Sequence, residues 1–259
     1  MIKLIKYEIR KQAGILTVLT AAAAFFPVAA LLGWILFRDD AIIGIPMVLA
    51  FFCMAVSPFF IGVESILLLN RELKTGQSRL VWMVPRSTLQ ILGARLLAAG
   101  LQAIYLFVLF AASLAVGFLF LLIIALLTWD AAVSLQTPEE MINSLLYLLS
   151  PSSGYWSMLI PIFVKGFLLW LQLITSGFLA VLLARTILEN SRQGAGFSVL
   201  LFFAANFLIN GCYRLVSGFS CFAAMPAVFW SVFDPVYYLG AGALFFLLSV
   251  ILADRALSL

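Results

Sequence analysis

Six long apolar segments are the feature that most restricts how this chain can fold. They cover residues 14–37, 41–69, 96–128, 155–184, 195–216 and 235–253. A helix needs about 20 apolar residues to cross the hydrocarbon layer of a bilayer, so each segment is long enough to span it. Only 10% of the residues are charged, whereas soluble domains carry about a quarter charged residues. We therefore expect an all-α polytopic membrane protein, with six transmembrane helices in one domain over residues 1–259.

The Lys and Arg residues predict how these helices are oriented. With a cytoplasmic N-terminus, all but three of the 15 cations fall on the inner side, the exceptions being Arg38, Lys165 and Arg214. Cytoplasmic loops of membrane proteins carry such an excess of cations. We expect a multi-pass protein of the plasma (inner) membrane with both termini in the cytoplasm. This placement accounts for the net charge of +4 without a nucleic-acid partner, and Lys165 is expected to extend toward the outer interface.

Several classes of enzyme are excluded by residues that the chain lacks. It contains no histidine, so neither a Ser-His hydrolase nor a His-ligated metalloprotease can be built from it. No lysine follows a glycine, so there is no P-loop for ATP. Cys53, Cys212 and Cys221 lack metal-ligand spacing and are interpreted as packing residues. We predict no catalytic residue, no metal and no cofactor on this chain.

Three further segments are expected at the membrane surface. Residues 1–13 form an amphipathic interfacial helix with isoleucines on one face and cations on another. Residues 137–149 begin with a capping box and are expected to form an outer surface helix. Residues 217–233 are apolar but interrupted by glycine and proline, and we interpret them as an outer re-entrant hairpin before the last span. A seventh crossing in that place is the alternative.

The loop between the second and third spans, residues 70–88, carries the most specific pattern. An acid, a glycine, a proline and a base follow one another there as Glu72, Gly76, Pro85 and Arg95. The spacing of these four residues resembles the signature of type-2 ABC-exporter permeases.

The resemblance departs from the family at two positions and has definite implications. Gln77 stands where threonine is usual, and Arg86 follows the proline directly instead of a few residues later; the base at the end of the pattern is more often lysine. The resemblance implies a membrane subunit that binds separate cytoplasmic ATP-binding cassette ATPase subunits, which supply ATP and Mg. It also implies a homodimer, or a heterodimer with a second permease, in membrane lipid.

The loop also has a physical rationale of its own. A transporter without an ATP site must receive mechanical work from a soluble partner, through an element that protrudes into the cytoplasm. Charges of both signs suit docking, while the glycine and the proline limit how the chain continues as a helix. The alternative is a merely solvated, cation-rich loop. The predicted coupling residues are Asn70, Arg71, Glu72, Lys74, Gly76, Arg79 and Pro85.

Polar and aromatic residues of the second and fifth spans form the candidate translocation path. An acid within a span is costly and usually faces an interior, so Glu64 is interpreted as an inner gate or as an interfacial residue paired with Arg or Lys. Two asparagines of the fifth span share one face with two phenylalanines; they either line the path or make interhelical hydrogen bonds. The candidate path residues are Phe52, Phe59, Glu64, Phe203, Asn206, Phe207 and Asn210.

These patterns together predict the permease subunit of an ATP-driven ABC exporter. Its expected cargo is amphipathic or hydrophobic, such as a peptide, a drug or a lipid-like molecule. The alternative is a secondary transporter driven by an ion gradient, which would call for acids at the midplane and an internal repeat. An intramembrane enzyme is a third class, for which the sequence offers no catalytic constellation.

Overall fold

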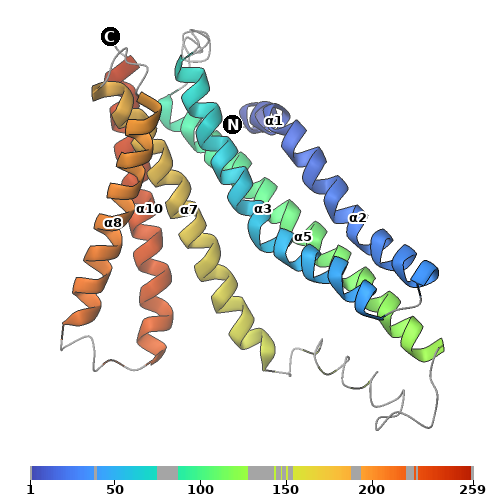
Figure 1. Ribbon diagram of the computed structural model, residues 1–259. Helices are drawn as coiled ribbons and strands as arrows, with labels where there is room; N and C mark the ends of the chain where they lie inside the picture. The colour runs from blue at the N-terminus through green and yellow to red at the C-terminus, as the bar shows by residue number, and fades with distance from the viewer. Residues whose placement is uncertain are drawn as a thin grey trace. The chain divides into compact units, whose positions relative to one another are not determined.

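The chain is an all-α, multi-pass membrane protein. The computed structural model describes residues 2–37, 40–74, 87–127, 143, 147, 150, 154–187, 194–219, 225 and 227–257. These residues form seven helices and no strand. Six of the helices are long and apolar enough to cross a membrane, which confirms the prediction from the six apolar segments (Figure 1).

The helices follow the apolar segments closely. The short helix α1 covers Ile2–Lys11. The long helices are α2 (Ala13–Phe37), α3 (Asp40–Lys74), α5 (Thr88–Leu127), α7 (Tyr155–Ile187), α8 (Gly194–Gly218) and α10 (Ala227–Leu257). Prolines inside them are tolerated because other groups in a membrane domain satisfy the freed carbonyls. Pro58 of α3 is an example: it cannot donate to the carbonyl of Met54, and the hydroxyl of Ser57 donates to that oxygen instead, at 3.3 Å.

Two helices begin well before their predicted starts. α5 begins at Thr88 instead of residue 96, with the backbone N–H of Gln90 donating to the Ser87 hydroxyl at 3.4 Å as in an N-cap. α10 begins at Ala227 instead of residue 235, so Asp234 lies within it. In both cases a charged residue was expected outside the span but is held inside it by a partner of opposite charge.

The predicted outer segments are described only in part. Within the expected hairpin 217–233, residues 217–218 end α8 and residues 227–233 belong to α10, while 220–224 and 226 lie outside the described residues. Of the expected outer helix 137–149, only residues 143 and 147 are described, and both are helical.

The helices belong to two compact units. Unit 1 comprises Met1–Gly14, Pro58–Ala103 and Val164–Leu259, and unit 2 comprises Ile15–Ser57 and Ile104–Phe163. In unit 2, the hydroxyl of Ser113 on α5 donates to the carbonyl of Ala23 on α2 at 2.6 Å. Gly117 of α5 has no side chain where the Met47 side chain of α3 lies, since an added Cβ would be only 1.8 Å from that methionine.

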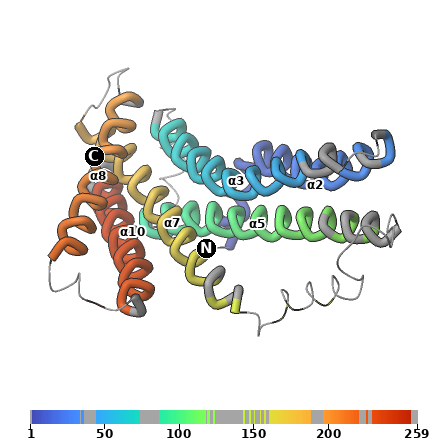
Figure 2. Tube along the Cα trace, turned by 60° about the horizontal axis from the view of Figure 1, so that its bottom comes forward, coloured from blue at the N-terminus to red at the C-terminus, as the bar shows by residue number. Residues whose placement is uncertain are grey.

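In unit 1, α7 is the central helix, with α8 and α10 beside it (Figure 2). In the most apolar stretch of α7, 67% of the residues are buried, whereas none are buried in the corresponding stretch of α8. Gly177 of α7 admits Ile66 of α3, and Gly62 of α3 admits Ile174 of α7, which brings the two helices into close approach. On its other side, α7 lies against Gly242 of α10, whose position would place a Cβ 3.4 Å from the Cα of Gln172. Both α3 and α10 are therefore anchored on α7.

Candidate functional site: a buried ion-pair cluster

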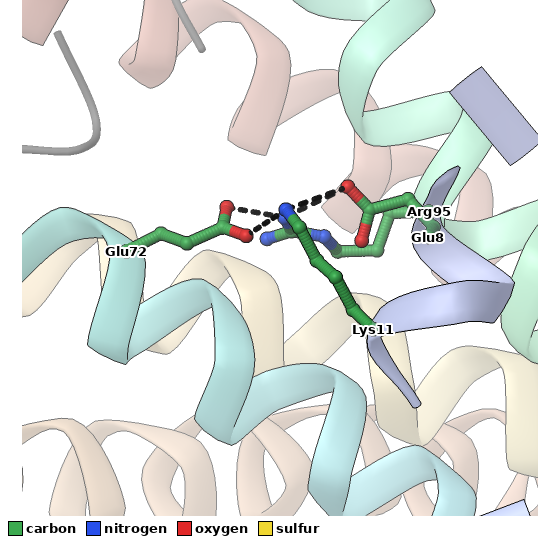
Figure 3. A network of polar contacts seen from close by, with 4 residues as sticks. All are labelled: Glu8, Lys11, Glu72 and Arg95. Carbon is green, nitrogen blue, oxygen red and sulfur yellow. Dashed lines mark hydrogen bonds and ion pairs between the residues drawn. The ribbon is translucent and has the colours of Figure 1, made fainter. Parts of the chain in front are cut away.

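Four charged side chains meet where α3 ends and α5 begins (Figure 3). Glu72 of α3 pairs with Arg95 of α5 and with Lys11 of α1. Arg95 also pairs with Glu8 of α1, at 3.3 Å between Nη2 and Oε1, and Lys11 lies 3.5 Å from the same oxygen. The four residues carry two positive and two negative charges; we call them the inner cluster because the distribution of cations predicts that this end of the helices is cytoplasmic. Burial of these charges is possible because they balance.

The inner cluster is deeply buried. The Arg95 side chain is 2% exposed, and those of Glu8 and Glu72 are 5% and 10% exposed. A buried charge without a partner is strongly destabilising, so each member depends on the others. Not every atom is satisfied, however: Oε2 of Glu8 and Nε of Arg95 have no hydrogen-bond partner within the described part of the chain.

The cluster determines how α1 lies in unit 1. α1 is amphipathic, as predicted, with exposed cations at Lys3, Lys6 and Arg10. The face opposite to these cations is not purely apolar, because Glu8 and Gln12 are its buried positions. The charge pairs of Glu8 and Lys11 therefore attach the N-terminal helix to α3 and α5.

A second contact extends this set of links to the last helix. The hydroxyl of Thr88, at the start of α5, donates to Oδ1 of Asp254 near the end of α10. Four helices of unit 1 are thus joined by polar side chains at one end.

The predicted coupling residues fall into two groups. Asn70, Arg71, Glu72 and Lys74 form the last turn of α3, whereas Gly76, Arg79 and Pro85 lie outside the described residues. Glu72 was expected to offer its charge to a soluble partner, but its carboxylate faces Arg95 and Lys11. Glu72 and Arg95, the first and last members of the sequence pattern, are therefore partners of each other; direct contact of the loop with an ATPase stays a prediction.

The two asparagines among the predicted path residues have different surroundings. Asn206 accepts a hydrogen bond from Gln172 and donates one to Ser176, both at 3.0 Å, so it joins α8 to α7. Asn210 is exposed and donates to the backbone carbonyl of Asn206 at 3.0 Å. The interhelical hydrogen bond that was one of the two interpretations is thus present at Asn206.

The aromatic path residues lie on the outside of their units. Phe203 and Phe207 are exposed on α8, and Phe52 is exposed on the part of α3 that belongs to unit 2. Phe59 borders an apolar cavity between α3, α7 and α8. Glu64 is half-buried and makes no ion pair with any residue in the described ranges.

Sequence reasoning missed a second group of charged and polar residues, which we call the outer cluster. Lys165 of α7 pairs with Oδ2 of Asp234 on α10, and the hydroxyl of Tyr213 on α8 donates to Oδ1 of the same carboxylate at 2.6 Å. Lys165 was expected to extend toward the outer interface. The acid was missed because the last span was expected to start after it, and the only available signal was that Asp234 directly adjoins a long apolar run.

Aromatic rings surround the outer cluster. Tyr213 stacks on Phe233 and Tyr238, and the hydroxyl of Tyr237 donates to the carbonyl of Ile209 at 2.7 Å. Amphipathic rings of this kind are enriched where spans meet the membrane surface. The outer cluster lies in the first third of α7 and of α10 and in the last third of α8, and on α10 it is far from Asp254, which is close to the end of that helix.

Comparison with models of known protein families, with curated proteins and with solved structures found no match.

Proposed function

We propose that this protein is the permease subunit of an ATP-driven exporter, working with a separate ATP-binding cassette ATPase on its cytoplasmic side. It would act as a dimer, with itself or with a second permease, in the plasma (inner) membrane. Both termini and residues 75–86 would face the cytoplasm, as the distribution of cations indicates.

The observation that carries this proposal is the pairing of Glu72 with Arg95. These residues lie on the two helices that enter and leave residues 75–86, and the sequence pattern that resembles exporter permeases begins and ends with them. A force applied to the intervening residues by a soluble partner would reach α3 and α5 together, because the ion pair prevents the two helix ends from separating. Through the pairs Arg95–Glu8 and Glu72–Lys11, the same movement would reach α1.

An amphipathic or hydrophobic cargo suits the surface of the helices. The exposed faces of α3 and α8 carry phenylalanines, with the amide of Asn210 among them. The competing proposal, a transporter driven by an ion gradient, rests on the half-buried Glu64, which has no ion-pair partner within the described ranges. A single acid of this kind favours it less than the loop pattern favours an exporter.

The test is reconstitution in vesicles of the chain with the ATPase that co-purifies with it. A dye-labelled amphipathic peptide and a short-chain fluorescent lipid serve as the two cargo probes. We expect efflux to require ATP, and the chain alone to show no ATPase activity. Efflux driven by a proton or sodium gradient without ATP, or ATP hydrolysis by the chain alone above contaminant controls, would contradict the proposal.

A coupling role for the inner cluster predicts a distinct defect. In Glu72→Gln/Arg95→Gln, both charges of the pair are removed, leaving Glu8 and Lys11 to pair with each other. We expect ATP hydrolysis to continue while the cargo exported per ATP falls several-fold. Lys165→Met breaks an ion pair at the other end of the helices and serves as the matched control, with this ratio unchanged. An equal ratio in both variants would mean that force enters the membrane domain elsewhere.

A further inference from the structure

An apolar groove lies between α3, α7 and α8 of unit 1. Its volume is about 280 Å³. Trp170 and Ile174, which are buried, form part of its wall, while Phe59, Leu67 and Val199 at its edge are each more than half exposed. Because exposed surfaces of membrane-spanning helices face acyl chains, the groove opens toward lipid and not toward water.

The groove has the dimensions of an extended chain. It runs along α3 from Phe59 to Asn70 and along α7 from Trp170 to Val181, which is roughly 16 Å at a helical rise of about 1.5 Å per residue. An acyl chain that enters it gains little from leaving the bilayer, since the lipid interior is equally apolar. Preference for one lipid must therefore come from polar groups at an end of the groove.

Polar groups gather at one end, where α3 and α7 terminate and α8 begins. Asn70 lines the groove there, and its side chain makes no hydrogen bond with the described residues. Ser198 also lines it, close to the first turn of α8. The N-terminus of a helix carries a partial positive charge and favours an anion.

Arg185 supplies a full positive charge at the same end. It follows Ile174, Gly177 and Val181 on one face of α7, and long side chains on a helix extend back over the preceding turn, toward the groove. Its Nη2 is buried without a hydrogen-bond partner, and it forms no ion pair within the described part of the chain. Part of the residue is accessible, since Arg185 as a whole is half-buried.

We infer that the groove binds an anionic phospholipid, with one acyl chain between α3, α7 and α8 and the phosphate at Arg185 and Asn70. Arg185, which has no ion-pair partner among the described residues, selects the charge of the headgroup, and the groove selects a single extended chain. Basic sites between membrane helices near the cytoplasmic surface commonly hold anionic headgroups. This inference requires only that the chain spans a membrane and does not depend on an ATPase partner.

Native mass spectrometry of the detergent-purified chain tests the inference. The protein is offered equal amounts of phosphatidylglycerol and phosphatidylcholine with identical acyl chains. We expect roughly a tenfold preference for phosphatidylglycerol, the factor that corresponds to about 1.4 kcal/mol. Arg185→Gln should abolish the preference, and Arg214→Gln, which alters an exposed arginine of α8 away from the groove, should not.

A second pair of variants tests the groove itself by placing a bulky side chain at its exposed edge. Val199→Trp should reduce the retention of either lipid several-fold, whereas Leu200→Trp, at the next position and equally exposed but outside the groove, should leave it unchanged. If Arg185→Gln fails to fold, Arg185→Lys must still prefer phosphatidylglycerol. Equal binding of the two lipids by the unaltered chain would overturn the inference. The inference would also be overturned if Val199→Trp retained lipid as well as the unaltered chain does but no longer formed a dimer. In that case a second copy of the chain, and not a lipid, would cover the groove.

Discussion

The inner and outer clusters solve the same problem, burying charge in a membrane protein, in different ways. The inner cluster joins four charges from three helices, and its arginine is almost completely covered. The outer cluster holds one carboxylate between a lysine and a tyrosine, and the lysine side chain is 45% exposed. Both are neutral if every carboxylate is ionised and every base protonated, so neither leaves a net charge inside the protein.

The clusters differ in how completely their members are satisfied. Both oxygens of Asp234 have a partner in the outer cluster. In the inner cluster, Oε2 of Glu8 and Nε of Arg95 have none within the described ranges, although both residues are buried. A fully satisfied network rigidifies and specifies one arrangement, whereas a partly satisfied one has atoms left that can take another partner. We therefore expect the contacts around Glu8 to rearrange more readily than those of Asp234, while Glu72 and Arg95 stay paired. We call the inner cluster a joint and the outer cluster a fastening.

The largest effect is expected from Arg95→Gln in the inner cluster. This change leaves Glu8 and Glu72 buried with only Lys11 to compensate two negative charges. Breaking a buried pair from one side costs about 3–5 kcal/mol, and we expect a loss of this size in the free energy of unfolding in detergent. Glu72→Gln/Arg95→Gln should lose clearly less, because the remaining Glu8 and Lys11 balance. Equal losses in the two variants would show that the cost comes from packing and not from charge.

Lys165→Met in the outer cluster should have a smaller effect, about 1.5–3 kcal/mol, the usual value of hydrogen bonds to a charged group. It leaves the Asp234 carboxylate with the hydroxyl of Tyr213 as its remaining partner. Asp234→Asn should cost less, on the order of 1 kcal/mol, because the exposed lysine can turn to solvent. Unfolding in the same detergent compares the two. The reverse order would mean that Lys165 is held inside the protein, against the contrast between the clusters.

The spans could be predicted from sequence, and the exact ends of two of them could not. Apolar length alone locates the helices, because no other backbone structure but a closed barrel satisfies its hydrogen bonds in lipid. Arg95 and Asp234 were placed outside the spans because a lone charge in a membrane is costly. They lie inside because Arg95 meets Glu8, 87 residues away, and Asp234 meets Lys165, 69 residues away. Such distant pairings follow from how helices pack, which a single sequence does not contain.

The sequence singled out Glu72 and Arg95 by their spacing but did not predict that their side chains pair. The spacing from Glu72 to Arg95 was recognised as specific, yet Glu72 was treated as an exposed docking charge because it adjoins a polar loop. Its burial depends on α1, whose acid at position 8 and lysine at position 11 complete the cluster. Asn206 was similarly open to two interpretations, since its partners Gln172 and Ser176 come from another helix.

Tyr213→Phe in the outer cluster should have a smaller effect than Lys165→Met, and it tests whether that cluster is a fixed fastening. The change removes the hydroxyl that donates to Oδ1 of Asp234 but keeps the ring that stacks on Phe233 and Tyr238. Lys165 still pairs with Oδ2, so the carboxylate keeps one charged partner, and we expect a loss of about 1.5 kcal/mol. Tyr237→Phe is the matched control: its hydroxyl donates to a neutral backbone carbonyl, and its loss should cost about 1 kcal/mol or less.

Adding Tyr213→Phe to Lys165→Met distinguishes a fixed arrangement from an adaptable one. If Asp234 is held in one position by two donors, removal of the second donor leaves a buried, unpaired carboxylate. The double variant should then lose more stability than the sum of the single variants, by about 0.5 kcal/mol or more, since neighbours that share a partner are not additive. Strict additivity would mean that the carboxylate finds new partners when either donor is removed. The outer cluster would then be as adaptable as the inner one, and the distinction between a fastening and a joint would fail.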